Sequence, residues 1–371
     1  MLKRQATQRA IALLEIASVS IPLFQKVQKT PAGGFTLRLK LSAGVSMKDL
    51  ELIAERFAVA LKVDTVKFTK ISANGVLLSA QKGLPKHLPK MPTSQTNQMT
   101  LFPTSPNKVP IGIDADGSLV EVELFSSAGG TVTLIGGNPG KGKSSLLKII
   151  VSGLLDSNHS IIWFDAKSGA DARPFRHRAD VFDDPSNPEQ FLEILTKIQE
   201  LVRRRNQFNG RGWDIAPLSK TILVIDEWAV LAGLGSKQLQ TSIQQELRKI
   251  VATARSANVS VILATQRPTK DNIDITTREL SNTRIAFQVG DIHASEAILG
   301  FSGAEPAVNN LPRGRALKWE NGDVTKFALF DLSNVSSNPL AMNGGLKLTV
   351  EDLLLQADTF EREHLKYGST Q

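Results

Sequence analysis

Two patterns of apolar residues alternate along the larger part of the chain. Short runs rich in β-branched residues, such as TVTLI at 131–135, predict strands buried on both faces. Longer stretches with one apolar face, such as QTSIQQELRKIVATARSA at 240–257, predict amphipathic helices. Strands that alternate with helices form a mainly parallel sheet covered on both sides. The predicted fold class of this region is therefore α/β.

The same patterns assign the remaining elements of this region. A hairpin-like pair of strands is expected within 111–124 around Asp116-Gly117, because Asp-Gly favours a tight turn. Further strands are expected at 160–165, 221–231, 259–266, 284–290, 314–319 and 325–330. Helices are expected at 146–155, 185–208, 293–299 and 348–368.

The first quarter of the chain has its own alternation. Residues 34–41 alternate apolar and polar positions, as a half-buried strand does, and 63–71 and 75–82 read as two more strands. The stretch 47–62 has one apolar face and predicts a helix. These elements form a small β-α-β-β domain, and residues 1–24 predict a basic helix ahead of it.

Proline marks the border between the two regions. Residues 83–110 hold six prolines with Thr, Ser, Asn and Gln, which is typical of a linker. The expected domains are therefore a basic N-terminal helix and small α/β domain, a Pro-rich linker, a motor domain and a helical tail. Their boundaries are 1–82, 83–110, 111–336 and 337–371.

A phosphate-binding loop follows the strand at 131–135. Gly137 to Ser144 matches G-x-x-x-x-G-K-[ST], in the strand–loop–helix context that this motif requires. Glycines let backbone N–H groups approach phosphate oxygens, and the helix N-terminus adds partial positive charge. Lys143 can reach the β- and γ-phosphates of ATP, and the Ser144 hydroxyl can ligate Mg²⁺. The expected nucleotide-binding residues are Gly137, Asn138, Pro139, Gly140, Lys141, Gly142, Lys143, Ser144 and Ser145.

Two acidic residues end the apolar run TILVI at 221–225. Open α/β sheets bind ligands at the carboxyl ends of their strands, where Asp226 and Glu227 are expected. Asp226 fits the acid that supports Mg²⁺ through water, and Glu227 fits the base that activates water for attack on the γ-phosphate. The pair follows the P-loop by about 80 residues, with two elements between, so we predict hydrolysis of ATP rather than binding alone.

Two further polar residues have open roles on sequence alone. Gln266 ends the next strand, where it can sense the γ-phosphate or simply cap the strand. Arg255, at the end of the preceding helix, can be a solvated surface residue or a functional one.

Charge and composition narrow the class of protein. Residues 1–90 carry 15 Lys and Arg against 5 Asp and Glu, a net charge of +10, whereas the remainder carries 29 against 31. A basic first quarter indicates contact with a polyanion or a merely soluble Lys-rich surface, and the charge alone leaves both open. The absence of Cys excludes disulfides and thiolate chemistry. No apolar stretch reaches the ~18 residues of a membrane span, so we expect a cytoplasmic protein that reaches a membrane only through partners.

Several motifs together carry a resemblance to a known family. Residues from about 111 to 330 contain GGNPGKGKSS, IIWFDAKSGAD, TILVIDEWAVL, ARSANVSVILATQRP, NTRIAFQV and GFSGAE. This region resembles the FtsK/SpoIIIE family of DNA-pumping ATPases, within the HerA/FtsK superfamily, and ATQRP and TRIAF at this spacing are specific to it. The segment 35–82 also looks like the small domain that precedes the motor in those proteins.

The resemblance implies a RecA-like core in a ring, usually a hexamer, around double-stranded DNA. By the same resemblance, Arg255 is the arginine that reaches a neighbour's nucleotide, and Gln266 is the sensor glutamine. Arg284 matches the arginine of TRIAF, with its role left open. Arg267 and Lys270 are the candidate DNA contacts in the motor.

The chain also departs from the family's chromosome-segregating members. It shows no membrane anchor and no winged-helix domain after the motor, so it looks more like plasmid-transfer proteins. We therefore expect a DNA translocase in plasmid or mobile-element transfer. The alternatives are a protein-export motor of the same fold, as in type VII secretion ATPases, and a nucleotide-gated DNA-binding switch with little turnover.

Overall fold

The computed structural model describes residues 107–154, 159–332 and 347–368, and parts of 27–90 that include four strands. The predicted helix at 1–24 and most of the predicted linker lie outside these described residues. The chain divides into two compact units, which we describe separately. The first is Met1–Pro89 with 113–120 and 326–328, and the second is the remainder.

The first unit contains a four-stranded antiparallel sheet of order β1-β2-β4-β3. Leu37, Leu78 and Phe68 pair across β2, β4 and β3, and all three are buried. Arg38 and Lys67 occupy alternate positions and are exposed, so they point to the opposite face of the sheet. The strands span Val27–Lys29 (β1), Phe35–Lys40 (β2), Thr65–Lys70 (β3) and Gly75–Gln81 (β4). The three predicted strands are therefore present, and β1 is an additional one.

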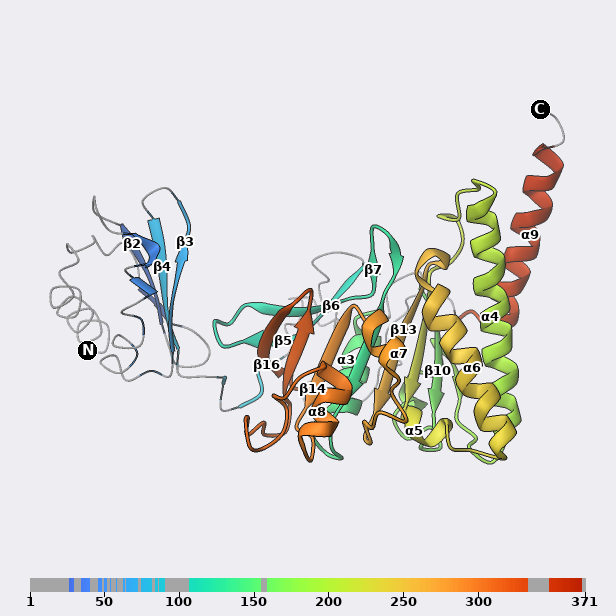
Figure 1. Cartoon of the computed structure of the whole chain (residues 1–371). Helices are drawn as coiled ribbons and strands as arrows, with labels where there is room; N and C mark the ends of the chain where they lie inside the picture. Colours follow the sequence, from blue (N-terminus) through green and yellow to red (C-terminus); the bar gives the residue numbers. More distant parts are fainter. Residues whose placement is uncertain are drawn as a thin grey trace. The chain divides into compact units, whose positions relative to one another are not determined.

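The second unit contains most of a ten-stranded mixed sheet (Figure 1). Its order is β11-β10-β12-β13-β9-β14-β15-β16-β5-β6. The strands from β11 to β14 are parallel, and β15 runs antiparallel to β14. The parallel strands span Ala179–Phe182 (β11), Ser160–Asp165 (β10), Thr221–Asp226 (β12), Val259–Thr265 (β13), Val132–Gly136 (β9) and Thr283–Phe287 (β14). The others span Arg315–Glu320 (β15), Asp323–Leu329 (β16), Lys108–Asp114 (β5) and Leu119–Glu123 (β6), and a small separate pair spans Phe125–Ser126 (β7) and Gly129–Gly130 (β8).

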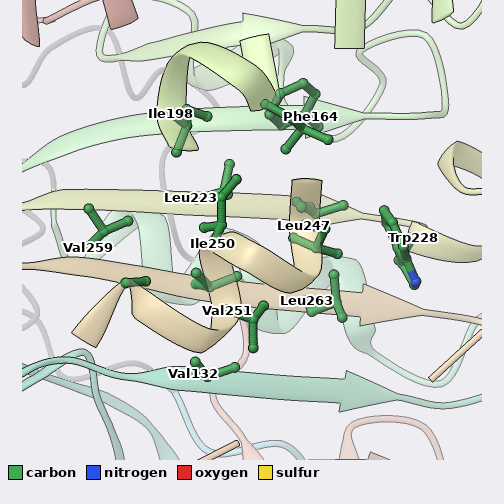
Figure 2. Packing of buried hydrophobic residues seen from close by; sticks show 14 of the residues in the cluster. Val132, Phe164, Ile198, Leu223, Trp228, Leu247, Ile250, Val251, Val259 and Leu263 are labelled. Carbon is green, nitrogen blue, oxygen red and sulfur yellow. The ribbon is translucent and has the colours of Figure 1, made fainter. Parts of the chain in front are cut away.

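The central strands are buried on both faces, as their β-branched sequences predict. Every residue of β9, β10, β12 and β13 is buried. Leu223 and Leu263 face the helices Pro188–Gly210 (α4) and Lys237–Thr253 (α6), where they pack against Ile198 and Ile250 (Figure 2). Trp163, at an alternate position of β10, stacks on Phe175 instead. The predicted α/β class with a mainly parallel sheet of the RecA-like type is therefore confirmed.

Helices cover this sheet and continue its core. The main ones are Lys143–Ser152 (α3), Pro188–Gly210 (α4), Lys237–Thr253 (α6), Ile292–Leu299 (α8) and Val350–Gly368 (α9). Helix α9 lies along α4 (Figure 1), and its Leu353 and Phe360 belong to the same buried cluster as α4 and α6. Arg204 of α4 forms ion pairs with Asp358 and Glu361 of α9. The C-terminal helix is therefore part of the core of this unit.

Some elements differ from the sequence prediction. The prediction of a strand through 221–231 was wrong beyond Asp226, because Glu227 takes a left-handed conformation (φ 64°) and the next four residues, Trp228–Leu231, form the short helix α5. Strand β11 and helix α7 (Ile275–Leu280) were not predicted. Two short 3₁₀ turns, Arg173–Phe175 (η1) and Arg255–Ala257 (η2), complete the second unit. In the described parts of the chain, no helix has the length and apolar character needed to cross a membrane.

Candidate active site

The P-loop connects β9 to α3 at the carboxyl edge of the parallel strands. Its position is fixed by Gln288, which follows β14: the Asn138 N–H donates to the Gln288 carbonyl at 2.8 Å, and the Lys141 ammonium donates to its side-chain Oε1 at 2.8 Å. Lys141 is therefore engaged in holding the loop in this structure. Of the other predicted nucleotide ligands, Pro139 and Gly140 are exposed, and Ser144 and Ser145 are half-buried.

Close packing constrains the start of the loop. Gly137 has φ 153°, and a Cβ there would lie 2.5 Å from the Cβ of Phe287 on β14. Gly140 also has positive φ (73°), but a Cβ there would meet nothing within 4 Å. Gly137 is thus required both by the backbone and by its neighbour, whereas Gly140 is required by the backbone alone.

Lys143 is the first residue of α3 and only 4% exposed. Burial lowers the pKa of its ammonium to about 8, although the nearby carboxylates of Glu227 and Asp226 act in the opposite direction. A partly desolvated ammonium at a helix N-terminus gains strongly from an anionic partner. The arrangement therefore suits a triphosphate.

Asp226 and Glu227 lie at the end of β12, next to this lysine. Asp226 is fully buried, and burial raises the pKa of its carboxyl while Lys167 opposes that rise. The Glu227 carboxylate is held through Oε1, which accepts the Gln266 N–H at 2.8 Å and the Thr265 hydroxyl at 3.4 Å. Its Oε2 is buried with no hydrogen-bond partner. A fixed carboxylate with one unused oxygen is suited to accept a hydrogen bond from an attacking water.

The same edge of the sheet offers ligands for Mg²⁺. The Oδ1 atom of Asp226 is buried and has no hydrogen-bond partner, and Ser144 lies at the start of α3. Within the described residues, no three acidic or His side chains cluster as a metal cage. Mg²⁺ commonly uses one or two protein oxygens together with substrate phosphates and water, so Ser144 and Asp226 fit this ion.

The loop after β10 adds two charged residues that the sequence analysis did not single out. Lys167 forms an ion pair with Asp226, its Nζ lying 3.1 Å from Oδ2. Asp171 accepts hydrogen bonds from the side chains of Ser144 and Lys148, which lower the pKa of its carboxyl against the effect of burial. The sequence could have indicated these two residues through DAKSGAD, a charged segment directly after a buried strand, because ligands bind at this edge of such sheets.

Gln266 and Arg255 lie at opposite ends of β13. Gln266 follows the carboxyl end and contacts Glu227 through its backbone N–H. Arg255 is exposed in η2, before the amino end of β13. A strand of seven residues separates them, which is about 23 Å at ~3.3 Å per residue. The structure therefore brings Gln266 to the nucleotide site and leaves Arg255 far from the site of its own chain.

The three remaining predicted residues also have defined positions. Arg284 on β14 stacks over the Trp319 ring at 4.0 Å and donates to the Leu299 carbonyl at the end of α8, so it joins β14, β15 and α8. Arg267 and Lys270 are exposed on the loop after β13. Lys270 Nζ lies 3.8 Å from a Glu296 carboxylate oxygen.

Comparisons with known proteins find similarity to ATPases. The family model described as "ATPase family associated with various cellular activities (AAA)" matches residues 133–289, which run from β9 past β14. DNA translocase FtsK of Agrobacterium fabrum is 39% identical over 117 residues, which are 30% of this chain and 13% of that protein. ESX secretion system protein EccC of Geobacillus thermodenitrificans is 27% identical over 259 residues, which are 60% of this chain and 17% of that protein.

One solved structure covers almost the whole fold. The pCW3 conjugation coupling protein TcpA, in a monomer form with ATPγS, aligns with 95% of this chain and 99% of its own at a TM-score of 0.59 and 16% identity. At this identity the likeness shows the fold alone, and the two curated relatives are far longer than the part that matches. The predicted resemblance to FtsK proteins is nevertheless confirmed: part of the chain is similar in sequence to a DNA translocase FtsK, residues 133–289 match an ATPase family model, and the P-loop domain has the RecA-like α/β fold.

Proposed function

We propose that the chain hydrolyses ATP to move double-stranded DNA through a ring of its own copies, in plasmid or mobile-element transfer. The observation that carries the proposal is the meeting of Lys143, Asp226 and Glu227 at one edge of the sheet, with Glu227 held by the end of β13. Sequence similarity to a DNA translocase supports DNA as the polymer. We further propose that the motor works in the cytoplasm.

The residues divide the hydrolysis between them. The P-loop backbone and the Lys143 ammonium bind the phosphates, and Ser144 and Asp226 hold Mg²⁺, which neutralises charge on the transferring phosphoryl group. Glu227 orients water and takes its proton through the carboxylate oxygen that has no partner in this structure. Gln266 shares a hydrogen bond with Glu227, so a change at the γ-phosphate reaches the loop that follows β13.

The position of Arg255 supports the proposed ring. Its side chain is exposed about 23 Å along β13 from its own nucleotide site, by the strand geometry above. It can stabilise a transition state only in an adjacent copy. The turn that carries Arg255 is held by α4, because Asn206 and Asn209 donate to the carbonyls of Thr253 and Ser256. An exposed arginine on a turn held in this way suits a finger acting in trans, and we propose a hexamer.

Arg267 and Lys270 are the proposed DNA contacts of the motor, together with the basic face of the N-terminal sheet. Both follow Gln266 directly on an exposed loop. That loop begins beside Glu227, since the Arg267 N–H donates to the Thr265 hydroxyl that also contacts Glu227. Contacts to phosphate from this loop would couple DNA to the hydrolytic carboxylate.

Export of protein is the second candidate, because the match to EccC covers 60% of this chain. A nucleotide-gated DNA-binding switch keeps the same site but turns over slowly. Two measurements distinguish the three functions: which polymer stimulates ATP hydrolysis, and how fast ATP is hydrolysed.

The test is steady-state ATP hydrolysis with linear duplex DNA at about 50 to 200 mM salt. We expect DNA to stimulate the rate at low salt, and the stimulation to fall steeply with salt because phosphate contacts release counterions. The variant Arg267→Ala/Lys270→Ala should lose stimulation and keep its DNA-free rate. An unchanged rate with DNA, together with stimulation by an extended peptide, would favour export. DNA binding without appreciable turnover would favour the switch.

A further inference from the structure

The Lys167 ammonium forms an ion pair with Asp226, the carboxylate that we propose as a magnesium ligand. Its Nζ lies 3.1 Å from Oδ2 of Asp226 and 3.6 Å from Oδ2 of Asp171. The Asp226 side chain is fully buried, whereas that of Lys167 is 29% exposed. The ammonium therefore reaches from the surface into the site, where Asp226 keeps its second oxygen buried without a partner.

The loop that carries Lys167 is shaped to present it. The carboxylate of Asp165 at the end of β10 accepts three backbone N–H groups, those of Lys167 at 2.8 Å, Asp171 at 3.1 Å and Ala172 at 3.1 Å. Asp165 itself pairs in register with Asp226 on β12. Asp165 thus fixes the conformation of the loop, and in this conformation Lys167 lies next to Asp226 on the adjacent strand β12.

Asp171, on the same loop, holds a second magnesium ligand. Its carboxylate accepts a hydrogen bond from the Ser144 side chain and forms an ion pair with Lys148 at 2.7 Å. In this structure both protein ligands of the metal therefore have partners from one loop: Ser144 has Asp171, and Asp226 has Lys167. Bringing both oxygens to one metal ion requires both contacts to change.

We propose that Lys167 is a built-in counter-cation that occupies Asp226 when no metal–nucleotide complex is bound, and that this complex displaces it onto Asp171. Asp171 already lies 3.6 Å from Nζ, so a small side-chain movement completes the exchange as Ser144 turns to the metal. A lone divalent ion then competes with a tethered ammonium for Asp226, so the site selects magnesium that arrives with nucleotide. The inference rests on the proposed role of Asp226.

The test measures metal binding to the full chain without nucleotide, using Mn²⁺ as the probe and electron paramagnetic resonance to count free ions. We expect Lys167→Met to bind Mn²⁺ at least tenfold more tightly than wild type, and Mg²⁺ to displace it. Lys197→Met is the control, because Lys197 pairs with Glu193 and Glu351 and with none of the residues of this site; its Mn²⁺ affinity should equal that of wild type. Lys167→Gln repeats the measurement with a polar side chain, and thermal melting establishes that each variant is folded.

Two results would overturn the proposal. One is equal Mn²⁺ affinity in wild type, Lys167→Met and Lys167→Gln. The other is a loss of ATP affinity of tenfold or more in Lys167→Met in the presence of EDTA, which would make Lys167 a phosphate ligand. A separate measurement tests the proposed magnesium site itself: Ser144→Ala and Asp226→Asn should each weaken Mg²⁺-dependent ATP binding. If they leave it unchanged, the metal site itself is wrongly assigned, whatever Lys167 does.

Discussion

Replacing Gly137 by alanine tests whether the P-loop owes its shape to the strand beside it. The comparison is with Gly140→Ala in the same loop, which adds the same methyl group. Both glycines have positive φ, but only at Gly137 would the added Cβ lie 2.5 Å from Phe287 Cβ. Carbon atoms pack at about 3.5–4.0 Å, so the loop or β14 must move in Gly137→Ala.

The size of each effect follows from these contacts. In Gly140→Ala the left-handed backbone costs about 1–2 kcal/mol, partly offset by about 0.4–1 kcal/mol from a stiffer unfolded chain. Gly137→Ala adds a steric overlap of about 1–3 kcal/mol to a glycine-only conformation that itself costs about 1–3 kcal/mol. Relief by moving the loop leaves a minor binding-competent population. A difference of about 3 kcal/mol corresponds to ~100-fold in affinity.

The assay is titration with a fluorescent ATP analogue and Mg²⁺, alongside thermal melting of both variants. We expect Gly140→Ala to bind within about tenfold of wild type and Gly137→Ala to lose about 100-fold or more, while both remain folded. Equal affinities in the two variants would refute the reasoning, because both the contact with Phe287 and the glycine-only backbone conformation predict a larger loss at Gly137.

Three further predictions concern the catalytic groups. Glu227→Gln should bind ATP normally and release phosphate at least ~10²-fold more slowly, the scale of general-base catalysis; near-normal turnover would assign the base elsewhere. The pKa of Lys143 is lowered to about 8, and a bound triphosphate favours its charged form, so ATP binding takes up a proton above pH 8. The affinity for ATP should therefore be constant below pH 8 and fall by up to about tenfold per pH unit above it. A constant affinity up to pH 9.5 would contradict this prediction. Arg255→Ala should reduce turnover by about 10³–10⁵, and mixing it with Lys143→Ala should partly restore activity; no recovery in mixed rings, verified by native mass measurement, would count against action in trans.

The sequence predicted the parts of the fold that depend on local pattern. Strands β9, β12 and β13 are buried on both faces and carry continuous apolar runs, so period and length identify them. The P-loop and the acidic pair were predicted because their chemistry follows those strands directly. The structure also gives Arg284, whose role the sequence left open, contacts with Trp319 and with the end of α8.

Other features depend on contacts that no local pattern encodes. The apolar run continues through WAVL, but the left-handed Glu227 ends β12 and turns these residues into α5, where the Trp228 indole donates to the Asn272 carbonyl. Strand β11 has one fully buried residue and is defined by its pairing with β10. Lys167 and Asp226 are 59 residues apart in sequence, and only the adjacency of β10 and β12 brings them together.

We propose that ATP hydrolysis moves the protein along duplex DNA, and displacement of a third strand tests this most directly. Linear duplex carrying a labelled triplex-forming oligonucleotide at one end is incubated with protein, ATP and Mg²⁺, and release of the oligonucleotide is followed with time. Wild type should release it with ATP but not with ATPγS, and Glu227→Gln should bind the DNA and leave the third strand in place. DNA-dependent hydrolysis by wild type without any release would contradict translocation.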